Sequence, residues 1–207
     1  MTPARWTALC AVAYNLLHHL GAIPDGLGTA PQSTRWVDWL DLLTPYAVVG
    51  TALAALAAAG TDRRGWWLAL LGAAAYVQGH GIHLAANSIG NARGDAAPVH
   101  LWDEVVGHWL WYAGMALLVV ALCRVVHLTV RPIGVALALT TGLTWTTNAL
   151  EGTTAVGSLA VATCLTVWGL RRSDGTGRLL MVAFGTSAVL LASYGLWQLG
   201  FPPPSEL

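Results

Sequence analysis

The sequence predicts an all-α integral membrane protein, built as a single seven-transmembrane-helix bundle. Of its 207 residues, 56% are hydrophobic and only 10% are charged, whereas soluble domains carry about 25% charged residues. The mean hydropathy of the whole chain is +0.59. The chain therefore has too few polar residues to cover the surface of a water-soluble protein. We therefore expect residues 1–207 to form one membrane domain without a separate soluble domain.

Seven apolar stretches are long enough to cross the hydrocarbon core, which takes about 20 helical residues. Most are bounded by Pro, Gly or paired arginines, which interrupt helices. The first stretch contains Asn15, His18 and His19. A cleaved signal peptide avoids such residues in its apolar core, so we expect this stretch to be retained as a helix. The expected spans are residues 6–23, 43–60, 66–89, 103–123, 132–150, 154–170 and 179–200.

Small residues on the second stretch predict where helices pack closely. Gly50, Ala54 and Ala58 follow one another at four-residue intervals. Such spacing places small residues on one face, where two helix backbones can approach. We expect this face to be buried against a neighbouring helix.

The distribution of arginines predicts the orientation, because cationic loops remain in the cytoplasm. With a cytoplasmic N-terminus, only Arg35 and Arg93 fall outside. The arginines that then fall inside are Arg5, Arg63, Arg64, Arg124, Arg131, Arg171, Arg172 and Arg178. The C-terminus is then extracytoplasmic or luminal. The predicted location is a bacterial inner or plasma membrane, or the endoplasmic reticulum membrane in a eukaryote, with multiple passes.

Several function classes are excluded by composition. The chain has no lysine, which excludes Schiff-base chemistry such as that of retinal pigments and pyridoxal phosphate enzymes. Its formal net charge is zero and it has no basic run, so nucleic acid is not an expected partner. The three cysteines are scattered in apolar stretches and form neither a disulfide framework nor a zinc motif.

Polar residues gather at one depth of the predicted bundle. An ionisable side chain near the middle of a span costs about 2.5–3.5 kcal/mol, so such residues are kept away from lipid. His80, His83 and Asn87 share one face of the third stretch, and the fourth begins with Asp103 and Glu104. The remaining polar residues at this level are Asn15, His18, His19, Asp38, Asp41, His108, Asn148 and Glu151. The sequence predicts a polar pocket open to the outer leaflet, with membrane lipid as the expected partner.

The spacing within this group predicts a metal site. Glu104 and His108 are four residues apart, which lets two ligands on one helix hold one ion. His83 could supply a third ligand and leave an open position, as in catalytic zinc sites. Asp103 or Glu151 would then be available as a general base for water attack on an ester or amide. The alternative is a metal-free hydrogen-bond network that fixes helix packing.

The candidate site divides into three sets. The predicted catalytic residues are Asp103, Glu104, His108 and Glu151. The predicted pocket residues are His83, Asp41, Asn87, Trp111, Tyr112 and Asn148. The predicted ligands of a divalent metal such as zinc are His83, Glu104 and His108.

Several short motifs in this region form a pattern. They are Gly81-Ile82-His83-Leu84 with Ser88, Asp103-Glu104-Val105-Val106-Gly107-His108 with Trp111-Tyr112, Thr44-Pro45, and Glu151-Gly152. On these motifs the chain resembles the ceroid-lipofuscinosis neuronal protein 6 family over roughly residues 38–170. His80, Asn87 and Asn91 fall outside the family pattern. The resemblance carries over His83, Asp103, Glu104, Gly107, His108, Glu151 and Asp41.

The resemblance implies a multi-pass protein of the endoplasmic reticulum, with seven helices and a luminal C-terminus, that helps newly made lysosomal enzymes leave that compartment. The composition of this chain, with arginine as its only cationic residue apart from histidine, is typical of a high-GC bacterial genome. Because bacteria have no endoplasmic reticulum, the shared polar site would reflect an older role in lipid chemistry or lipid binding.

We expect a lipid-modifying, hydrolase-like enzyme that uses a divalent metal. Whether the chain is an enzyme stays open, because a non-catalytic binder of a lipid or small molecule would use the same pocket. A chaperone-like factor for protein export is also open, with a second copy of the chain or another membrane protein as partner. A transporter fits less well, because the polar groups stop at one level of the bundle.

Overall fold

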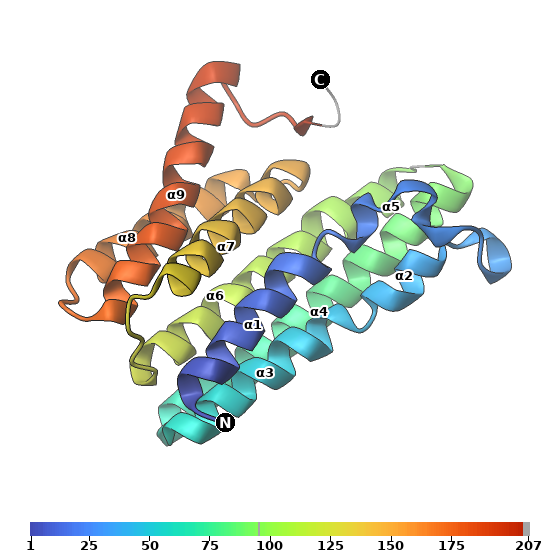
Figure 1. Cartoon of the computed structure of the whole chain (residues 1–207). Helices are drawn as coiled ribbons and strands as arrows, with labels where there is room; N and C mark the ends of the chain where they lie inside the picture. The colour runs from blue at the N-terminus through green and yellow to red at the C-terminus, as the bar shows by residue number, and fades with distance from the viewer. Residues whose placement is uncertain (95, 205–207) are drawn as a thin grey trace.

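The computed structural model describes residues 1–94 and 96–204, and the regular structure of this part is helical, without β-strands. Seven of its helices have 15 residues or more (Figure 1). They are α1 (Pro3–Leu17), α3 (Thr44–Ala59), α4 (Arg63–Arg93), α6 (His108–Val125), α7 (Pro132–Glu151), α8 (Ala155–Leu170) and α9 (Gly175–Gln198). The shorter elements are α2 (Trp36–Asp41), α5 (Ala97–His100) and a π-helical segment, Leu101–Gly107, that continues into α6. Three 3-10 turns, Leu20–Ala22, Pro24–Leu27 and Pro31–Ser33, precede α2.

Each of the seven apolar stretches coincides with one long helix, although several ends differ. The helix α1 ends at Leu17 instead of residue 23, because short 3-10 turns begin at Leu20 and Pro24. The helix α4 begins at Arg63 because the Asp62 side chain accepts a hydrogen bond from the backbone of the first turn. These differences leave the order of the helices as expected.

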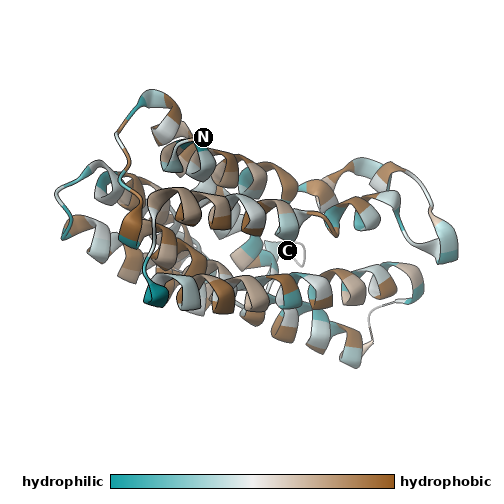
Figure 2. Cartoon of the chain, turned by 90° about the horizontal axis from the view of Figure 1, so that it is seen from below, coloured by the Kyte–Doolittle hydropathy of each residue, from teal (hydrophilic) through white to brown (hydrophobic). Residues whose placement is uncertain are grey.

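Three helical segments are long and apolar enough to cross a membrane, namely Trp36–Ala59, Ala97–Val125 and Gly175–Gln198. Large hydrophobic side chains also lie on the outside of the molecule, as at Leu196 and Trp197 of α9. Figure 2 shows hydrophobic residues along the helices and hydrophilic residues mainly at loops and helix ends. This surface is suited to contact with lipid tails.

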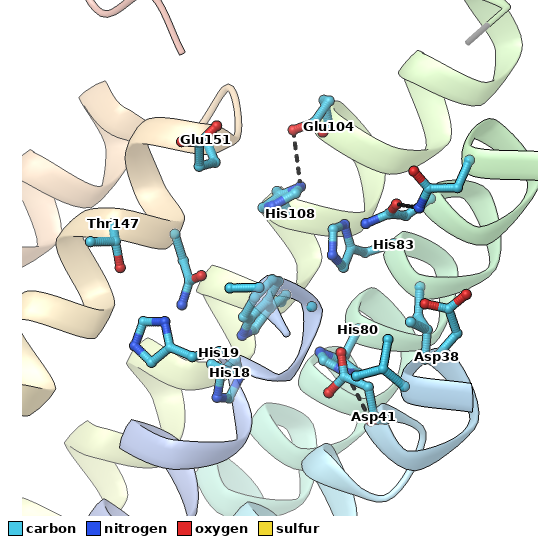
Figure 3. Close-up of a pocket in the computed structure, with 18 of the residues that line it drawn as sticks. His18, His19, Asp38, Asp41, His80, His83, Glu104, His108, Thr147 and Glu151 are labelled. Atoms are coloured by element: carbon cyan, nitrogen blue, oxygen red, sulfur yellow. Dashed lines mark hydrogen bonds and ion pairs between the residues drawn. The ribbon is translucent and has the colours of Figure 1, made fainter. Parts of the chain in front are cut away.

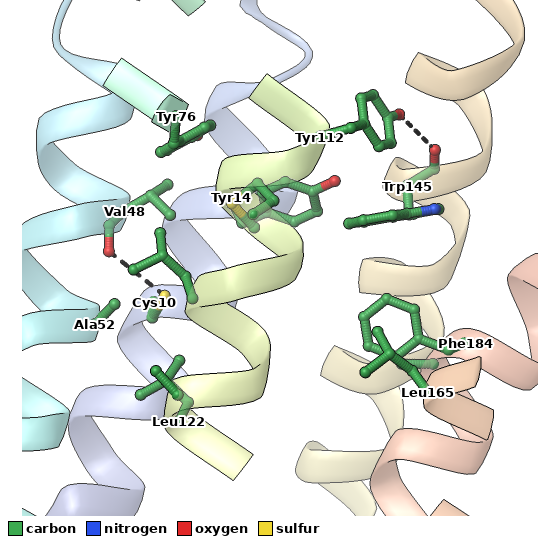
Figure 4. Packing of buried hydrophobic residues seen from close by; sticks show 14 of the residues in the cluster. Cys10, Tyr14, Val48, Ala52, Tyr76, Tyr112, Leu122, Trp145, Leu165 and Phe184 are labelled. Carbon is green, nitrogen blue, oxygen red and sulfur yellow. Dashed lines mark hydrogen bonds between the residues drawn. The ribbon is translucent and has the colours of Figure 1, made fainter. Parts of the chain in front are cut away.

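The long helices form two groups that share one core. The helices α1, α3, α4 and α6 pack together, and α7, α8 and α9 pack beside them (Figure 1). The Asn15 side chain joins the groups by donating from Nδ2 to Thr140 Oγ1 of α7 at 2.6 Å. Within the core, the Trp145 ring lies edge-on to Tyr112 of α6 and to Phe184 of α9 (Figure 4).

Glycines bring the backbones of α4 and α6 into direct contact. A Cβ atom on Gly79 would lie 2.3 Å from the backbone nitrogen of Trp111, and one on Gly114 would lie 2.3 Å from that of Tyr76. The expectation that Gly50 marks a buried face is wrong: Gly50 is exposed, and a Cβ there would meet nothing within 4 Å. Four-residue spacing identifies a face of a helix, but not what that face packs against.

We predict that Gly79→Ala destabilises the protein and Gly50→Ala does not. The Gly79 methyl group would force the two backbones apart, and overpacking of this kind costs about 1–3 kcal/mol. At exposed Gly50 the same change removes backbone freedom from the unfolded chain and stabilises the helix by about 0.5–1 kcal/mol. Thermal unfolding of the two variants in detergent measures both effects. Equal shifts in the two variants would contradict the packing argument.

Loops at the end of the bundle opposite His83 and Asp103 are held together by an arginine and an aspartate. The Arg172 guanidinium donates to the Asp174 carboxylate at 3.0 and 2.5 Å and to the Cys123 carbonyl at the end of α6. Asp174 also accepts the Gly177 backbone N–H and so caps α9. Arg172, the Gly177 N–H and His127 together hold the pKa of Asp174 well below its usual value.

We predict that Asp174 makes stability dependent on pH in the acid range. A carboxylate with a lowered pKa stabilises the folded state above its unfolded pKa, about 3.9, and this contribution is lost as the pH falls. Asp174→Asn keeps the helix cap but removes the charge, because Asn and Asp cap about equally well. The melting temperature should therefore fall less in Asp174→Asn than in the wild type between about pH 6 and pH 3. Parallel curves would contradict the assignment.

Candidate functional site

A cavity of about 390 Å³ lies at the end of the bundle opposite the Arg172–Asp174 pair. Its wall is built by the end of α1, by α2, α4 and α7, and by the junction of the π-helical segment with α6 (Figure 3). The lining residues are His18, His19, Gly21, Ala22, Arg35, Val37, Asp38, Asp41, His80, His83, Leu84, Asn87, Asn91, Glu104, His108, Trp111, Thr147, Asn148 and Glu151.

The π-helical segment orders Asp103 and His108. In a regular α-helix, residues five apart lie about 140° apart around the axis, whereas a π-helix is wider and its hydrogen bonds join residues five apart, so such residues lie closer to one face. The imidazole Nδ1 of His108 lies 2.9 Å from the Asp103 carbonyl oxygen. Because a carbonyl only accepts, Nδ1 is the protonated nitrogen of neutral His108, and the lone pair lies on Nε2. Glu104 Oε2 is farther from Nδ1, at 3.6 Å.

Two glycines allow the neighbouring elements to approach these residues. A Cβ on Gly107 would lie 2.8 Å from the backbone nitrogen of His83, so the glycine lets the π-helical segment lie directly against α4. A Cβ on Gly152, just after α7, would lie 2.6 Å from Cδ2 of His108. The imidazole is therefore held between α4 and the end of α7.

His83, Asp103 and His108 could together hold a metal ion. One donor atom from each lies within 4.8 Å of the other two. His83 Nδ1 and Asp103 Oδ1 are only 2.5 Å apart, yet neither atom has a hydrogen bond of normal geometry among the described residues. Buried nitrogen and oxygen atoms that lack a hydrogen-bond partner can act as ligands of a cation. Two imidazoles with a carboxylate are a ligand set that zinc accepts.

A stack of rings forms the floor of the cavity. His18 Nδ1 lies 2.9 Å from the Tyr14 carbonyl, so Nδ1 carries the proton and Nε2 accepts from the Tyr76 hydroxyl at 2.8 Å. The His18 ring stacks on Trp111, with 4.9 Å between ring centroids. These contacts fix the end of α1 against α4 and α6.

His80 and Asp41 form a second polar pair in the wall. His80 Nε2 lies 3.2 Å from the Asp41 carbonyl and 3.3 Å from Asp41 Oδ1. The Thr44 hydroxyl donates to the same Oδ1 at 2.6 Å. His80 is 1% exposed, and its Nδ1 has no hydrogen-bond partner among the described residues. The proton on Nε2 leaves a lone pair on this buried Nδ1.

An arginine and an aspartate close the side of the cavity that α2 forms. The Arg35 guanidinium donates to Asp38 Oδ1 at 3.1 and 2.7 Å. Asp38 Oδ2 accepts from the Ser88 hydroxyl of α4 at 3.0 Å. These bonds tie the loop before α2 to α4.

The structure brings most of the sequence-predicted site residues to this one cavity. The predicted residues in its wall are Asp41, His83, Asn87, Glu104, His108, Trp111, Asn148 and Glu151. Asp103 contacts His83 beside the wall and takes the position in the three-residue group that the sequence assigned to Glu104. Tyr112 does not line the cavity as expected. It lies about 100° farther around α6 than Trp111, and its hydroxyl donates to the Trp145 carbonyl in the core.

Some wall residues were not predicted as site members. His18 is among the polar residues expected at the depth of the pocket, but the sequence does not indicate its place in the ring stack. That place depends on a hydrogen bond to Tyr76, which is 58 positions away in the sequence. Arg35 and Thr147 gave no signal beyond their residue type. The spacing of His80 and His83 on one face did indicate that both point to the same region.

The arrangement combines two imidazoles, a carboxylate and an adjacent Glu104 at the edge of a cavity of ligand size. Such a set can bind a divalent metal or transfer protons. Comparisons of the chain with protein-family models, curated proteins and solved structures give no match.

Proposed function

We propose that this chain is a multi-pass membrane protein whose cavity binds a lipid headgroup and modifies it by metal-dependent hydrolysis. The observation that carries the proposal is the group formed by His83, Asp103 and His108, whose donor atoms lie within 4.8 Å of one another at the cavity. The motif resemblance to the ceroid-lipofuscinosis neuronal protein 6 family is part of the same proposal, since it rests on these residues.

The chemistry follows from the ligand set. His83, Asp103 and His108 would be the protein ligands of the metal, and catalytic metal sites are built from three such ligands. When bound there, a divalent metal would supply Lewis-acid activation of a water molecule near neutral pH. Glu104 lies beside His108, and Glu151 lines the same cavity, so either carboxylate is suited to accept a proton.

The proposed topology has seven spans with the N-terminus in the cytoplasm. Three observations support it. Three helical segments are long and apolar enough to cross a membrane, large hydrophobic side chains are exposed, and most arginines lie on the predicted cytoplasmic side. Arg124, in the last turn of α6, and Arg171 and Arg172, just after α8, lie at the end of the bundle away from the cavity. The cavity would then face the outer leaflet.

We predict that detergent-purified protein binds a transition metal, and that His108→Ala loses it. Removing even an outer partner of a metal ligand costs about 10–100-fold in affinity, and removing a ligand costs more. His127→Ala is the matched control, because His127 is an exposed histidine at the other end of the bundle. Elemental analysis after incubation with zinc measures the content of all three proteins.

A stoichiometric metal in the wild type and in His127→Ala, but not in His108→Ala, is the expected result. Absence of metal from all three would reject the metal-dependent enzyme and favour a non-catalytic binder. Circular dichroism of each variant checks that loss of metal does not follow from loss of fold.

We predict that Ser33→Cys and Ser173→Cys react from opposite sides of the membrane. Both serines are exposed, and they lie in the connections between helices at opposite ends of the bundle, Ser33 at the end of a 3-10 turn. In a background lacking the native cysteines, a membrane-impermeant maleimide should label Ser33→Cys in intact cells and Ser173→Cys only after lysis. The reverse pattern would invert the proposed orientation, and labelling of both in intact cells would reject the membrane topology.

A further inference from the structure

We infer that the ligand of this cavity carries an ammonium group on its polar head. The inference rests on the proposed function, since it names the class of lipid that the same cavity would accept. It is carried by the charges of the wall, by the unused oxygen of Asp41 and by the buried lone pair of His80.

The cavity wall carries more carboxylates than cations. Its acidic members are Asp38, Asp41, Glu104 and Glu151, and Asp103 lies beside them. Among the described residues, Arg35 is the one arginine in the wall, and the chain contains no lysine. With neutral imidazoles, Arg35 and a divalent metal would together offset three of the four negative charges of Asp38, Asp41, Asp103 and Glu151. The remaining charge favours a cationic ligand.

Arg35 is poorly available to an anionic ligand. Its guanidinium makes two hydrogen bonds to Asp38, at 3.1 and 2.7 Å, and its backbone N–H donates to the same carboxylate at 3.1 Å. Binding a phosphate through Arg35 would break this pair and leave the buried Asp38 without its main partner. The cavity therefore lacks the free cation that recognition of an anionic head requires.

Asp41 and His80 instead offer acceptors to a ligand that donates. Both interactions of the Asp41 carboxylate, with Thr44 and His80, use Oδ1. Among the residues that the structure describes, Asp41 Oδ2 has no hydrogen-bond partner. The proton on His80 Nε2 faces Asp41, so the buried Nδ1 can only accept. Both side chains line the cavity (Figure 3).

An ammonium group satisfies this arrangement. It carries a full positive charge, and a primary ammonium has three N–H donors. One donor would pair with Asp41 Oδ2, and another would pair with His80 Nδ1 once a rotation of the buried ring uncovers that atom. The charge would be balanced by the surrounding carboxylates. A neutral hydroxyl would supply a donor but no charge, and a phosphate would bring negative charge and acceptor oxygens to a wall that already has both.

The test compares two lipids that differ in the ammonium group. The whole protein, purified in detergent, is incubated with an equimolar mixture of phosphatidylethanolamine and phosphatidylglycerol that have the same acyl chains. Native mass spectrometry then measures which lipid is retained. We expect at least about tenfold enrichment of phosphatidylethanolamine, since hydrogen bonds to charged groups contribute that factor or more. Equal retention of the two lipids, or preference for phosphatidylglycerol, would overturn the inference.

Asp41→Asn identifies the residue responsible. The amide oxygen can still accept from Thr44 and His80, but the charge is lost, so the enrichment should fall close to one. The matched control is Asp25→Asn, because Asp25 is exposed and outside the cavity wall. It should behave as the wild type does. Unchanged enrichment in a folded Asp41→Asn protein would reject Asp41 as the ammonium partner, and the wild-type comparison decides the inference even if this variant does not fold.

Two further measurements are added. One distinguishes a free amine from a membrane lipid as the ligand, and the other distinguishes the ammonium inference from the proposed metal-dependent function. Soluble ethanolamine, added in excess, should displace the lipid only if the free amine suffices, whereas retention of the lipid against it identifies the membrane lipid as ligand. Metal content is measured on the same samples. Metal without ammonium preference leaves the proposed hydrolase and rejects this inference, and ammonium preference without metal does the opposite.

Discussion

The backbone contact between α4 and α6 is the constraint on which the rest of the structure depends. Gly79 and Gly114 allow the two helices to touch without intervening side chains. Gly107 extends this contact into the π-helical segment, and it sets His83 directly against that segment. Without this approach, Asp103 could not come within 2.5 Å of the His83 ring. The packing of small residues thus positions the polar site, and in a membrane such packing replaces the hydrophobic drive that is absent between lipid-facing helices.

The histidines of the cavity wall are oriented by hydrogen bonds to carbonyl oxygens. Because a carbonyl oxygen can only accept, the direction of each bond is fixed. Backbone carbonyls fix the proton on one nitrogen of His18 and of His108, and Asp41 does so for His80. Each ring then presents its other nitrogen in a defined state: His18 accepts from Tyr76, while His80 has no partner among the described residues. Hydrogen bonds to the backbone therefore determine which histidines have both ring nitrogens hydrogen-bonded and which keep a lone pair available to a ligand.

Much of the fold could be predicted from the sequence, because apolar length and helix-breaking residues are local signals. The site was predictable in part, since polar residues in an apolar chain stand out. What could not be predicted depends on contacts between distant elements or on non-standard helix geometry. The four-residue rule paired Glu104 with His108, but the π-helical turn brings in Asp103. The small face at Gly50 was assigned to packing, although the packing lies on α4 and α6. Adjacent Trp111 and Tyr112 were both assigned to the pocket, although they lie on different faces of one helix.

The cavity is bordered by both helix groups, and this division has a mechanical meaning. His83, Asp103 and His108 all belong to the unit that α4 and α6 form through their glycines. Thr147, Asn148 and Glu151 belong to α7, which packs mainly against α9 and α1 and meets α6 through Trp145 and Tyr112. A tilt of α7 relative to that unit would widen or narrow the entrance while the three clustered side chains kept their mutual geometry. The width of the entrance and the spacing of the clustered donor atoms are thereby set by different helix contacts.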